Sequence, residues 1–192
     1  MASAQLGARR FAELVKRYGP ETVASCIEAI WDRTDREVRS FVAKIPDGTY
    51  EAESYLDNDG RNLDLKILIK VKVIIDGERM VIDFSDMNDQ VPGPLNSGYS
   101  GGLAAARIAF KNVTQPQAPV NEGCFRALEM ILPEGKLLNA RHPAALGLYS
   151  IPLPTVIDTI LKALAPALPD KIPAAHKGDM GGCSISGFRP DG

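Results

Sequence analysis

One alternating run constrains the fold of this chain more than any other feature. From Leu63 to Ile75 every second residue is apolar, and lysines lie on the other side of the run. This period of two is typical of a β-strand with one buried face. After Asp76-Gly77 the alternation resumes from Met80 to Phe84, so the sequence predicts a β-hairpin that turns at the Asp-Gly pair. A third strand is expected from Thr49 to Leu56.

Two helices are expected before the hairpin. Apolar residues between Leu6 and Val15 are spaced for one helix face, and Gly19-Pro20 then interrupts the pattern. Pro20 suits the first turn of a second helix, in which apolar residues recur at three- and four-residue steps. This helix should end near Lys44, because Pro46 disfavours helical backbone in the residue before it.

The second half of the chain predicts a mixture of loops, helices and one strand. Residues 88–102 are rich in Pro, Gly, Asn and Ser, which is typical of a loop. Helices followed by an antiparallel hairpin and then mixed elements indicate an α+β fold rather than a regular βαβ alternation. We expect a helical region over residues 1–45 and a mixed α+β region over residues 46–192. The further elements expected are a helix from Leu103 to Asn112, a buried strand from Ala127 to Leu132 and an apolar helix from Val156 to Leu168.

Composition excludes several classes of protein. A chain of 192 residues can bury one sizeable core, and its formal net charge of -2 gives no field that favours nucleic acid or an anionic membrane. We expect no membrane span, because the apolar runs are broken by proline and charged residues, and no secretory signal, because no apolar segment follows the N-terminal arginines. The cysteines Cys26, Cys124 and Cys183 are too few for a disulfide framework, so a reducing, cytoplasmic setting is expected.

A polar cluster precedes the strand expected at residues 127–132, and its members are the candidates for catalysis: Asn121, Glu122, Cys124 and Arg126. Cys124 could act as a nucleophile if a positive field lowered the pKa of its thiol, and Arg126 could supply that field from the same face of a strand. A buried, inert thiol is the alternative. Glu122 could be an acid/base group or could cap the adjacent turn. The sequence assigns no catalytic role to any of the four.

A second candidate is the G-x-S-x-G match at residues 98–102, which would place Ser100 as a nucleophile on a tight turn between a strand and a helix. The residues before it are rich in proline and glycine and do not indicate a strand. Only His142 and His176 could serve as its base. The alternative is a glycine-rich loop in which Ser100 caps the helix that follows.

Metal binding is not predicted within this chain. A site needs several His, Cys or carboxylate ligands, and the chain has two histidines. Asp83, Asp86 and Asp89 follow the hairpin, but their spacing is not that of a calcium loop, so they are expected to be solvated or to cap turns. The glycine-rich segment at residues 178–182 could approach a ligand closely or could be a loose chain end.

Several motifs, in order along the chain, resemble the hydantoinase B/oxoprolinase family. This family comprises the B-type subunits or halves of ATP-dependent hydantoinases, 5-oxoprolinases and acetone or acetophenone carboxylases. The matching motifs are Leu6-Gly7-Ala8-Arg9-Arg10, Pro46-Asp47-Gly48-Thr49-Tyr50, Asp57-Asn58-Asp59-Gly60, Asp83-Phe84-Ser85, Gly93-Pro94-Leu95-Asn96, Asn121-Glu122-Gly123-Cys124-Phe125-Arg126 and Pro133-Glu134-Gly135.

The resemblance implies a division of labour in a hetero-oligomer. A hydantoinase A-type partner would use ATP and Mg²⁺ to phosphorylate the substrate, and the B-type component would then carry out hydrolysis or carboxylation. A divalent metal, Zn²⁺ or Mn²⁺, would bind in a His/Asp region that precedes the part resembled here. The chain would then be an internal piece that is inactive alone. Two alternatives stay open: a piece of a ketone carboxylase subunit, the branch to which Gly147-Leu148-Tyr149 is more similar, and a non-catalytic scaffold or assembly module.

Overall fold

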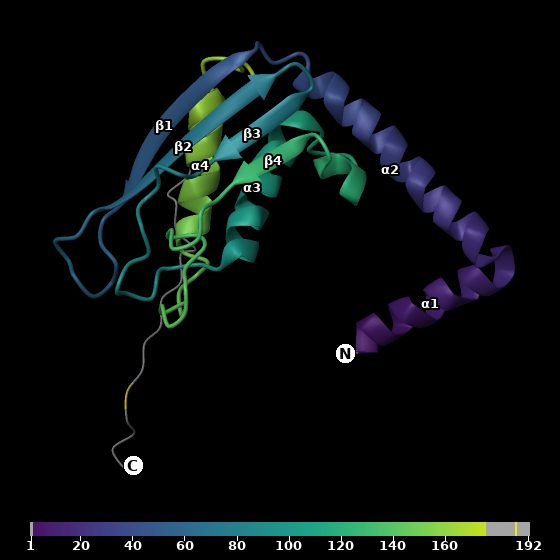
Figure 1. Ribbon diagram of the computed structural model, residues 1–192, viewed down its shortest axis with the longest axis horizontal. Coiled ribbons are helices and arrows are strands. Elements are labelled where there is room, and N and C mark those ends of the chain that lie inside the picture. Colours follow the sequence, from purple (N-terminus) through teal and green to yellow (C-terminus); the bar gives the residue numbers. More distant parts are fainter. Residues whose placement is uncertain (1, 176–186, 188–192) are drawn as a thin grey trace.

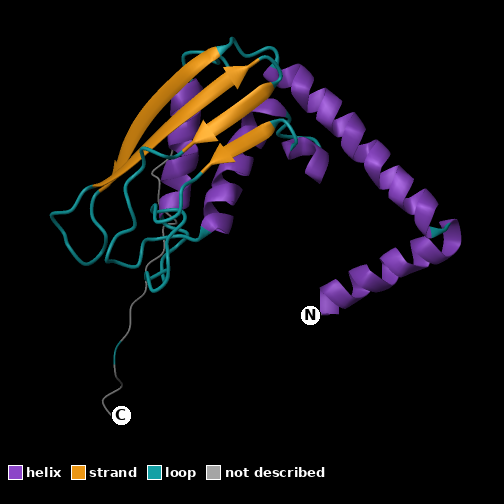
Figure 2. Cartoon of the chain, in the orientation of Figure 1, coloured by secondary structure: helices purple, strands orange, loops and turns teal. Residues whose placement is uncertain are grey.

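The structure is a computed structural model that describes residues 2–175 and residue 187, and its fold is α+β. A four-stranded sheet lies over two helices, and a helical hairpin extends away from one side of this body (Figure 1). Long loops gather at one end of the sheet (Figure 2). In chain order the elements are α1 (Ala2–Tyr18), α2 (Pro20–Val42), β1 (Gly48–Leu56), β2 (Ile67–Asp76), β3 (Arg79–Asp83), α3 (Tyr99–Thr114), the 3-10 helix η1 (Glu122–Phe125), β4 (Leu128–Ile131) and α4 (Pro152–Leu164).

The sheet has the order β1-β2-β3-β4, in which β1, β2 and β3 are antiparallel and β4 runs parallel to β3. The predicted hairpin is confirmed, with Asp76 opposite Arg79 across a two-residue turn. Gly77 in this turn has a φ of +58°. The first position of a type II′ turn needs such a positive φ, and glycine adopts it without steric cost. The third strand predicted from Thr49 to Leu56 is present as β1.

The start of the hairpin differs from the prediction. The alternating pattern begins at Leu63, whereas β2 begins at Ile67. Residues 63 and 64 form a turn in which the N–H of Leu65 donates to the carbonyl oxygen of Asn62. Leu63 is 74% exposed, so its apolar side chain extends the sequence pattern without joining the buried face of the sheet.

The later elements are present with different limits. The strand predicted from residues 127–132 is β4, but it alternates between half-buried and exposed residues because it lies at the edge of the sheet. The helix predicted from residue 103 begins earlier, at Tyr99. The last helix spans residues 152–164 rather than 156–168, since Pro152 and Pro154 fit its first turn, where a missing N–H breaks no helical hydrogen bond.

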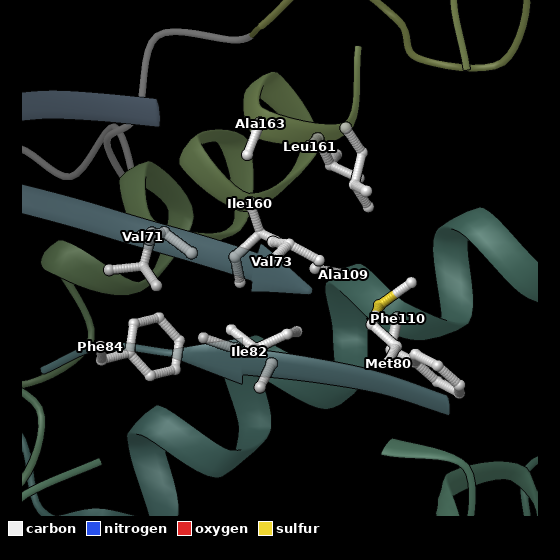
Figure 3. Packing of buried hydrophobic residues seen from close by; sticks show 14 of the residues in the cluster. Val71, Val73, Met80, Ile82, Phe84, Ala109, Phe110, Ile160, Leu161 and Ala163 are labelled. Carbon is white, nitrogen blue, oxygen red and sulfur yellow. The ribbon is translucent and has the colours of Figure 1, made fainter. Parts of the chain in front are cut away.

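The hydrophobic core lies between the sheet and helices α3 and α4. Every second residue of β2 from Ile67 to Ile75 is buried, which explains the alternation in the sequence. In Figure 3 the side chains of Val73 and Met80 point into the layer shared with Phe110 of α3 and Ile160 of α4. Burial of one such side chain stabilises the fold by roughly 1.5–3 kcal/mol. A one-residue slip of β2 would expose the whole set, so the pattern also specifies the register.

The predicted N-terminal helix pair is confirmed as α1 and α2. Gly19, with a φ of +82°, joins the helices, and Pro20 opens α2. The C-terminal end of α2 enters the core through Val38 and Val42, which are fully buried. Residues 3–18 of α1, in contrast, include no buried side chain. The hairpin is therefore anchored to the body at one end only.

Some sequence features lie outside the described residues, namely His176, Cys183 and the glycine-rich segment 178–182. Among the helices that are described, none combines the length and the apolar character needed to cross a membrane.

Candidate functional site

The polar cluster predicted beside the strand lies in η1 and its caps. Asn121 is the N-cap: its Oδ1 accepts the N–H of Gly123 at 2.9 Å, and its Nδ2 donates to Thr34 Oγ1 of α2 at 3.1 Å. The prediction that Cys124 and Arg126 share one face of a strand is wrong, because the chain turns as a 3-10 helix there before β4 begins. The residue that caps this turn is Asn121, and not Glu122.

The two charged members of the cluster are held in ion pairs. Glu122 accepts two hydrogen bonds from Arg107 of α3, at 3.0 and 3.2 Å. Arg126 donates to Asp32 at 2.6 Å and to Glu28 at 3.2 Å, both on α2. These pairs join η1 to α3 on one side and to α2 on the other. Each side chain thus has a structural role, and a catalytic role for either stays a prediction.

The Cys124 thiol is fully buried. Its Sγ lies 3.6 Å from the carbonyl oxygen of Pro119 and 4.0 Å from Nζ of Lys111, a lysine that is itself 9% exposed. Cysteine nucleophiles are usually partly exposed, because the thiolate has to reach the substrate. The geometry favours the buried, inert thiol over the nucleophile.

The G-x-S-x-G match does not form the turn that a nucleophilic serine requires. Ser100 is exposed in the first turn of α3, and residues 84–98 before it form a loop with one isolated bridge at Asp89. The alternative in which Ser100 caps α3 is also wrong, because the N-cap is Gly98 and no side chain caps the helix. His142 is exposed in the loop after β4.

The strongest polar arrangement lies at the loop end of the sheet (Figure 2) and was not predicted as a site. Asp59, between β1 and β2, is fully buried. Its Oδ1 accepts the N–H groups of Arg61 at 2.9 Å and Asn62 at 2.6 Å, and its Oδ2 accepts that of Gly93 at 2.9 Å. The N–H of Asn62, followed by that of Arg61, holds the pKa of Asp59 below its ordinary value; burial opposes this shift, and Gly93 adds to it.

A second buried polar residue completes this junction. Asn96 accepts the N–H of Val91 at 2.7 Å, and its Nδ2 donates to the carbonyl oxygens of Val91 at 2.8 Å, Gly93 at 3.0 Å and Ala145 at 3.1 Å. Asp59 and Asn96 together join the loops that follow β1, β3 and β4. We call this pair and its backbone partners the loop junction. The motifs that contain both residues were visible in the sequence, but their burial depends on contacts between distant segments.

A shallow pocket of about 500 Å³ opens beside the loop junction. Arg61 and Gln90 supply its polar side chains, and the rest of the lining is apolar. Such a surface can bind and orient a polar group of a ligand. Among the described residues, its lining includes no carboxylate, imidazole or thiol that could transfer a proton or attack a carbonyl. The lining residues are Arg61, Gln90, Val91, Pro92, Pro143, Ala144 and Ala145.

The carboxylates after the hairpin have the roles that the sequence predicts. Asp83 accepts the N–H of Ser85 at 2.8 Å, Asp89 pairs with Lys136 at 2.8 Å, and exposed Asp86 lies 3.9 Å from two lysines of β2. In the part of the chain that the structure describes, no group of three or more His, Cys, Asp or Glu side chains could hold a metal ion. The described residues therefore do not fit the metal that the resemblance implies.

Comparison with known proteins tests whether the chain belongs to the family that its motifs resemble. A model of the hydantoinase B/oxoprolinase family matches residues 1–192. This chain belongs to the hydantoinase B/oxoprolinase family. The match confirms the family that the motifs predicted, and the loop junction and η1 are built from several of those motifs.

Among curated members of the family, the chain is 31% identical over 188 residues to the beta subunit of caprolactamase from Pseudomonas jessenii, covering 96% of this chain and 32% of the relative. It is also 31% identical over 186 residues to a protein of Pseudomonas sp. strain NS671 that is named as the B-type subunit of a D-/L-hydantoinase, covering 91% and 31%. The chain thus spans about a third of the length of these two relatives.

Two solved structures share the fold. The ATP-dependent caprolactamase from Pseudomonas jessenii matches with a TM-score of 0.79 and 30% identity, covering 87% of this chain and 29% of that chain. A nucleotide-free acetone carboxylase matches with a TM-score of 0.75 and 15% identity, covering 88% and 24%. At 15% identity, the match to acetone carboxylase shows only that the two proteins share a fold.

Proposed function

We propose that this chain is part of the B-type subunit of an ATP-dependent enzyme that hydrolyses cyclic amides, and that it is inactive alone. The observation that carries the proposal is its 31% identity to caprolactamase and hydantoinase B-type subunits over more than nine-tenths of its length. The likeness of its fold to ATP-dependent caprolactamase supports the same function. Ketone carboxylation is the second candidate, because Gly147-Leu148-Tyr149 is more similar to the carboxylase branch of the family.

The parent enzyme divides the work between its components. A hydantoinase A-type partner uses ATP with Mg²⁺ to activate the carbonyl oxygen of the ring, and a divalent metal, Zn²⁺ or Mn²⁺, binds outside the described residues. In such a site a metal polarises a carbonyl or activates water. The carboxylates after the hairpin, Asp83, Asp86 and Asp89, are consistent with this division, since each is held by a lysine or a backbone N–H. The cytoplasm is the proposed location, because ATP is present and the scattered cysteines stay reduced there.

Within the parent enzyme, the loop end of the sheet forms one wall of the substrate cavity. The loop junction fixes the backbone of three loops, and the pocket beside it presents Arg61 and Gln90. A guanidinium and an amide can hold polar groups of a ring-opened product or its activated precursor by hydrogen bonds. This chain therefore binds and positions substrate, and the bond-breaking groups lie in other parts of the enzyme.

Co-expression with an A-type subunit and the remaining parts of a B-type subunit tests the proposal. Substrate-dependent ATP hydrolysis is measured with caprolactam, hydantoin, 5-oxoproline, and acetone with bicarbonate. We expect at least one cyclic amide to stimulate ATP hydrolysis and to be opened, and expect no turnover when this chain is omitted. If only acetone with bicarbonate stimulates ATP hydrolysis, the parent enzyme is a ketone carboxylase and not a cyclic-amide hydrolase. If the assembled complex were equally active without this chain, a role in substrate binding would be excluded. The chain would then be a non-catalytic scaffold or assembly module.

A further inference from the structure

The two polar side chains of the pocket beside the loop junction both present hydrogen-bond donors. The guanidinium of Arg61 carries N–H donors and has no acceptor atom. Gln90 uses its Oε1 to accept the N–H of Arg141 at 2.7 Å. Because only the carbonyl end of an amide can accept an N–H, this bond fixes the orientation of the side chain and leaves its NH2 group as a donor. The polar part of the lining therefore offers more donors than acceptors.

Both side chains project from anchored backbone. The N–H of Arg61 donates to Oδ1 of Asp59 at 2.9 Å, and the N–H of Gln90 donates to the carbonyl oxygen of Gly135 at 2.8 Å. Within the part of the chain that the structure describes, the guanidinium of Arg61 has no ion-pair or hydrogen-bond partner. The loop end of the sheet (Figure 2) thus holds an unneutralised positive charge beside an apolar surface.

The carboxylates around the pocket leave this charge available. Asp59 is fully buried, and its two oxygens already accept three backbone N–H groups. Asp89 pairs with Lys136 at 2.8 Å. The other carboxylates of the β1–β2 loop are exposed and lie outside the pocket lining, namely Asp57 and Asp64. The lining is therefore positive, and its charge is not cancelled from within the pocket.

We propose that this pocket binds an oxyanion, a carboxylate or a phosphoryl group, between Arg61 and Gln90. A planar guanidinium can donate two parallel hydrogen bonds to either group, and the amide NH2 adds a third. Hydrogen bonds to an ionised acceptor are roughly twice as strong as neutral ones, so an anion is favoured over the neutral carbonyl of an amide. A volume of about 500 Å³ is sufficient for a small molecule with a short apolar chain.

The assignment of the ligand rests on the proposed function. A neutral cyclic amide acquires an oxyanion at two points of its ATP-dependent hydrolysis. Activation by ATP adds a phosphoryl group, and opening of the ring releases a carboxylate. The pocket would then hold the activated substrate or the ring-opened product in preference to the intact ring.

Titration of the ¹⁵N-labelled whole chain, followed by two-dimensional NMR, tests the oxyanion site. The probes are hexanoate, inorganic phosphate and hexanamide, which has the chain of hexanoate but a neutral amide in place of the carboxylate. We expect hexanoate or phosphate to shift the amide signals of the pocket residues, with a dissociation constant on the order of millimolar. Hexanamide should bind at least about tenfold more weakly. The anion that binds more tightly shows whether the pocket takes the carboxylate or the phosphoryl group.

Two variants test the donors separately, and their spectra also show whether they fold. Arg61→Gln should raise the dissociation constant of the anion at least about fivefold, because the charge of the site is lost. Arg36→Gln is its control, since it removes the same charge from an exposed position on α2. Gln90→Glu keeps an acceptor for the N–H of Arg141 but replaces the NH2 donor with a carboxylate oxygen, so it should weaken binding at least about tenfold. Exposed Gln117→Glu adds the same charge elsewhere.

The proposal is wrong if neither anion shifts the signals of the pocket residues at concentrations up to about 50 mM. It is also wrong if hexanamide binds as tightly as hexanoate, or if the control variants weaken binding as much as Arg61→Gln and Gln90→Glu. Because the titration measures binding and not turnover, its failure would overturn the oxyanion site and leave the proposed function standing. An assembled enzyme that opens no cyclic amide would contradict the proposed function, whatever the titration shows.

Discussion

Two glycines in the family motifs are required by close approach of the backbone. A Cβ added at Gly93 would lie 1.9 Å from the carbonyl oxygen of Asp59, and one at Gly123 would lie 2.2 Å from that of Trp31. A side chain at either position would force two backbone segments apart. Gly93 belongs to the loop junction, and Gly123 lies where η1 meets α2. These motif residues therefore have a packing role that needs no participation in chemistry.

Replacing Gly93 tests the packing of the loop junction. Gly93→Ala should lower the free energy of unfolding by about 3 kcal/mol or more, because the added methyl group meets backbone that cannot move without breaking the bonds of Asp59. Urea unfolding of the two proteins measures the difference. Gly98→Ala is the control, since Gly98 has a φ of -83° and open space at its Cβ. Its effect should stay within about 0.5 kcal/mol, and equal effects at the two positions would contradict this account.

The carboxylate of Asp59 makes stability depend on pH. Its pKa in the folded protein lies below the ordinary value of 3.8, so its contribution is complete above that value and is lost as the pH falls through the lowered folded pKa. Asp59→Asn should therefore unfold at a lower temperature than the wild type at pH 7, and the difference should shrink below about pH 4. Thermal unfolding from pH 3 to 7 measures this. Exposed Asp64 lies in the same loop, so Asp64→Asn is the matched control for removal of a carboxylate there.

The buried thiol tests whether the motif around η1 is catalytic. In the assembled enzyme Cys124→Ala should keep the rate of substrate-dependent ATP hydrolysis within about twofold, because the side chain has no exposed surface from which to attack a substrate. The amount of folded protein is measured in parallel, so that a loss of stability is not mistaken for a loss of chemistry. A fall in rate of about a hundredfold or more, in a variant that still folds, would contradict this prediction and indicate that Cys124 is a nucleophile.

At the scale of elements, α2 links two parts of the molecule with different environments. Its C-terminal part packs against the core and against η1, and Arg126 beside η1 pairs with Glu28 and Asp32. Its first two turns, before Glu28, lie against α1. The ion pairs are partly exposed, and pairs of this kind contribute little and are screened by salt. They set the direction of the hairpin more than they stabilise the core.

Arg126→Gln tests this link between elements. At low salt the variant should unfold about 1–3 °C below the wild type, because two charge-assisted contacts are lost. At about 1 M salt the difference should largely disappear, since the exposed pairs are screened. Differential scanning fluorimetry at both salt concentrations measures it. If the difference in unfolding temperature did not change with salt, Arg126 would act through the packing of its side chain and not through its charge.

The sequence predicts elements well where one period persists. The alternation in β2 and the helical spacing in α2 follow directly from one buried face, so both elements were predicted. Leu63 was misassigned because its apolar side chain continues the period in a turn. Cys124 and Arg126 were expected to share one face of a strand, because a four-residue 3-10 helix is too short to show a period of its own. The burial of Asp59 depends on a loop 34 residues away, and local patterns do not contain that contact.

At the scale of the whole molecule, the chain has one layer of sheet over α3 and α4, a loop end with the loop junction, and a helical hairpin at the other side (Figure 1). The family motifs lie mainly where these parts meet. Residues that could transfer protons or bind a metal do not gather at the loop end, within the described part of the chain. This arrangement is consistent with the proposal that the chain shapes one wall of a substrate cavity while other components of the parent enzyme act on the substrate.

The most direct test of this account is the yield of ring-opened product from the purified chain, compared with the enzyme assembled from an A-type subunit and the remaining B-type segments. Caprolactam, hydantoin and 5-oxoproline are each incubated with and without ATP, and the products are quantified by chromatography. The account predicts no product from the chain alone and ATP-dependent product from the assembly that contains it. Ring opening by the isolated chain would contradict it.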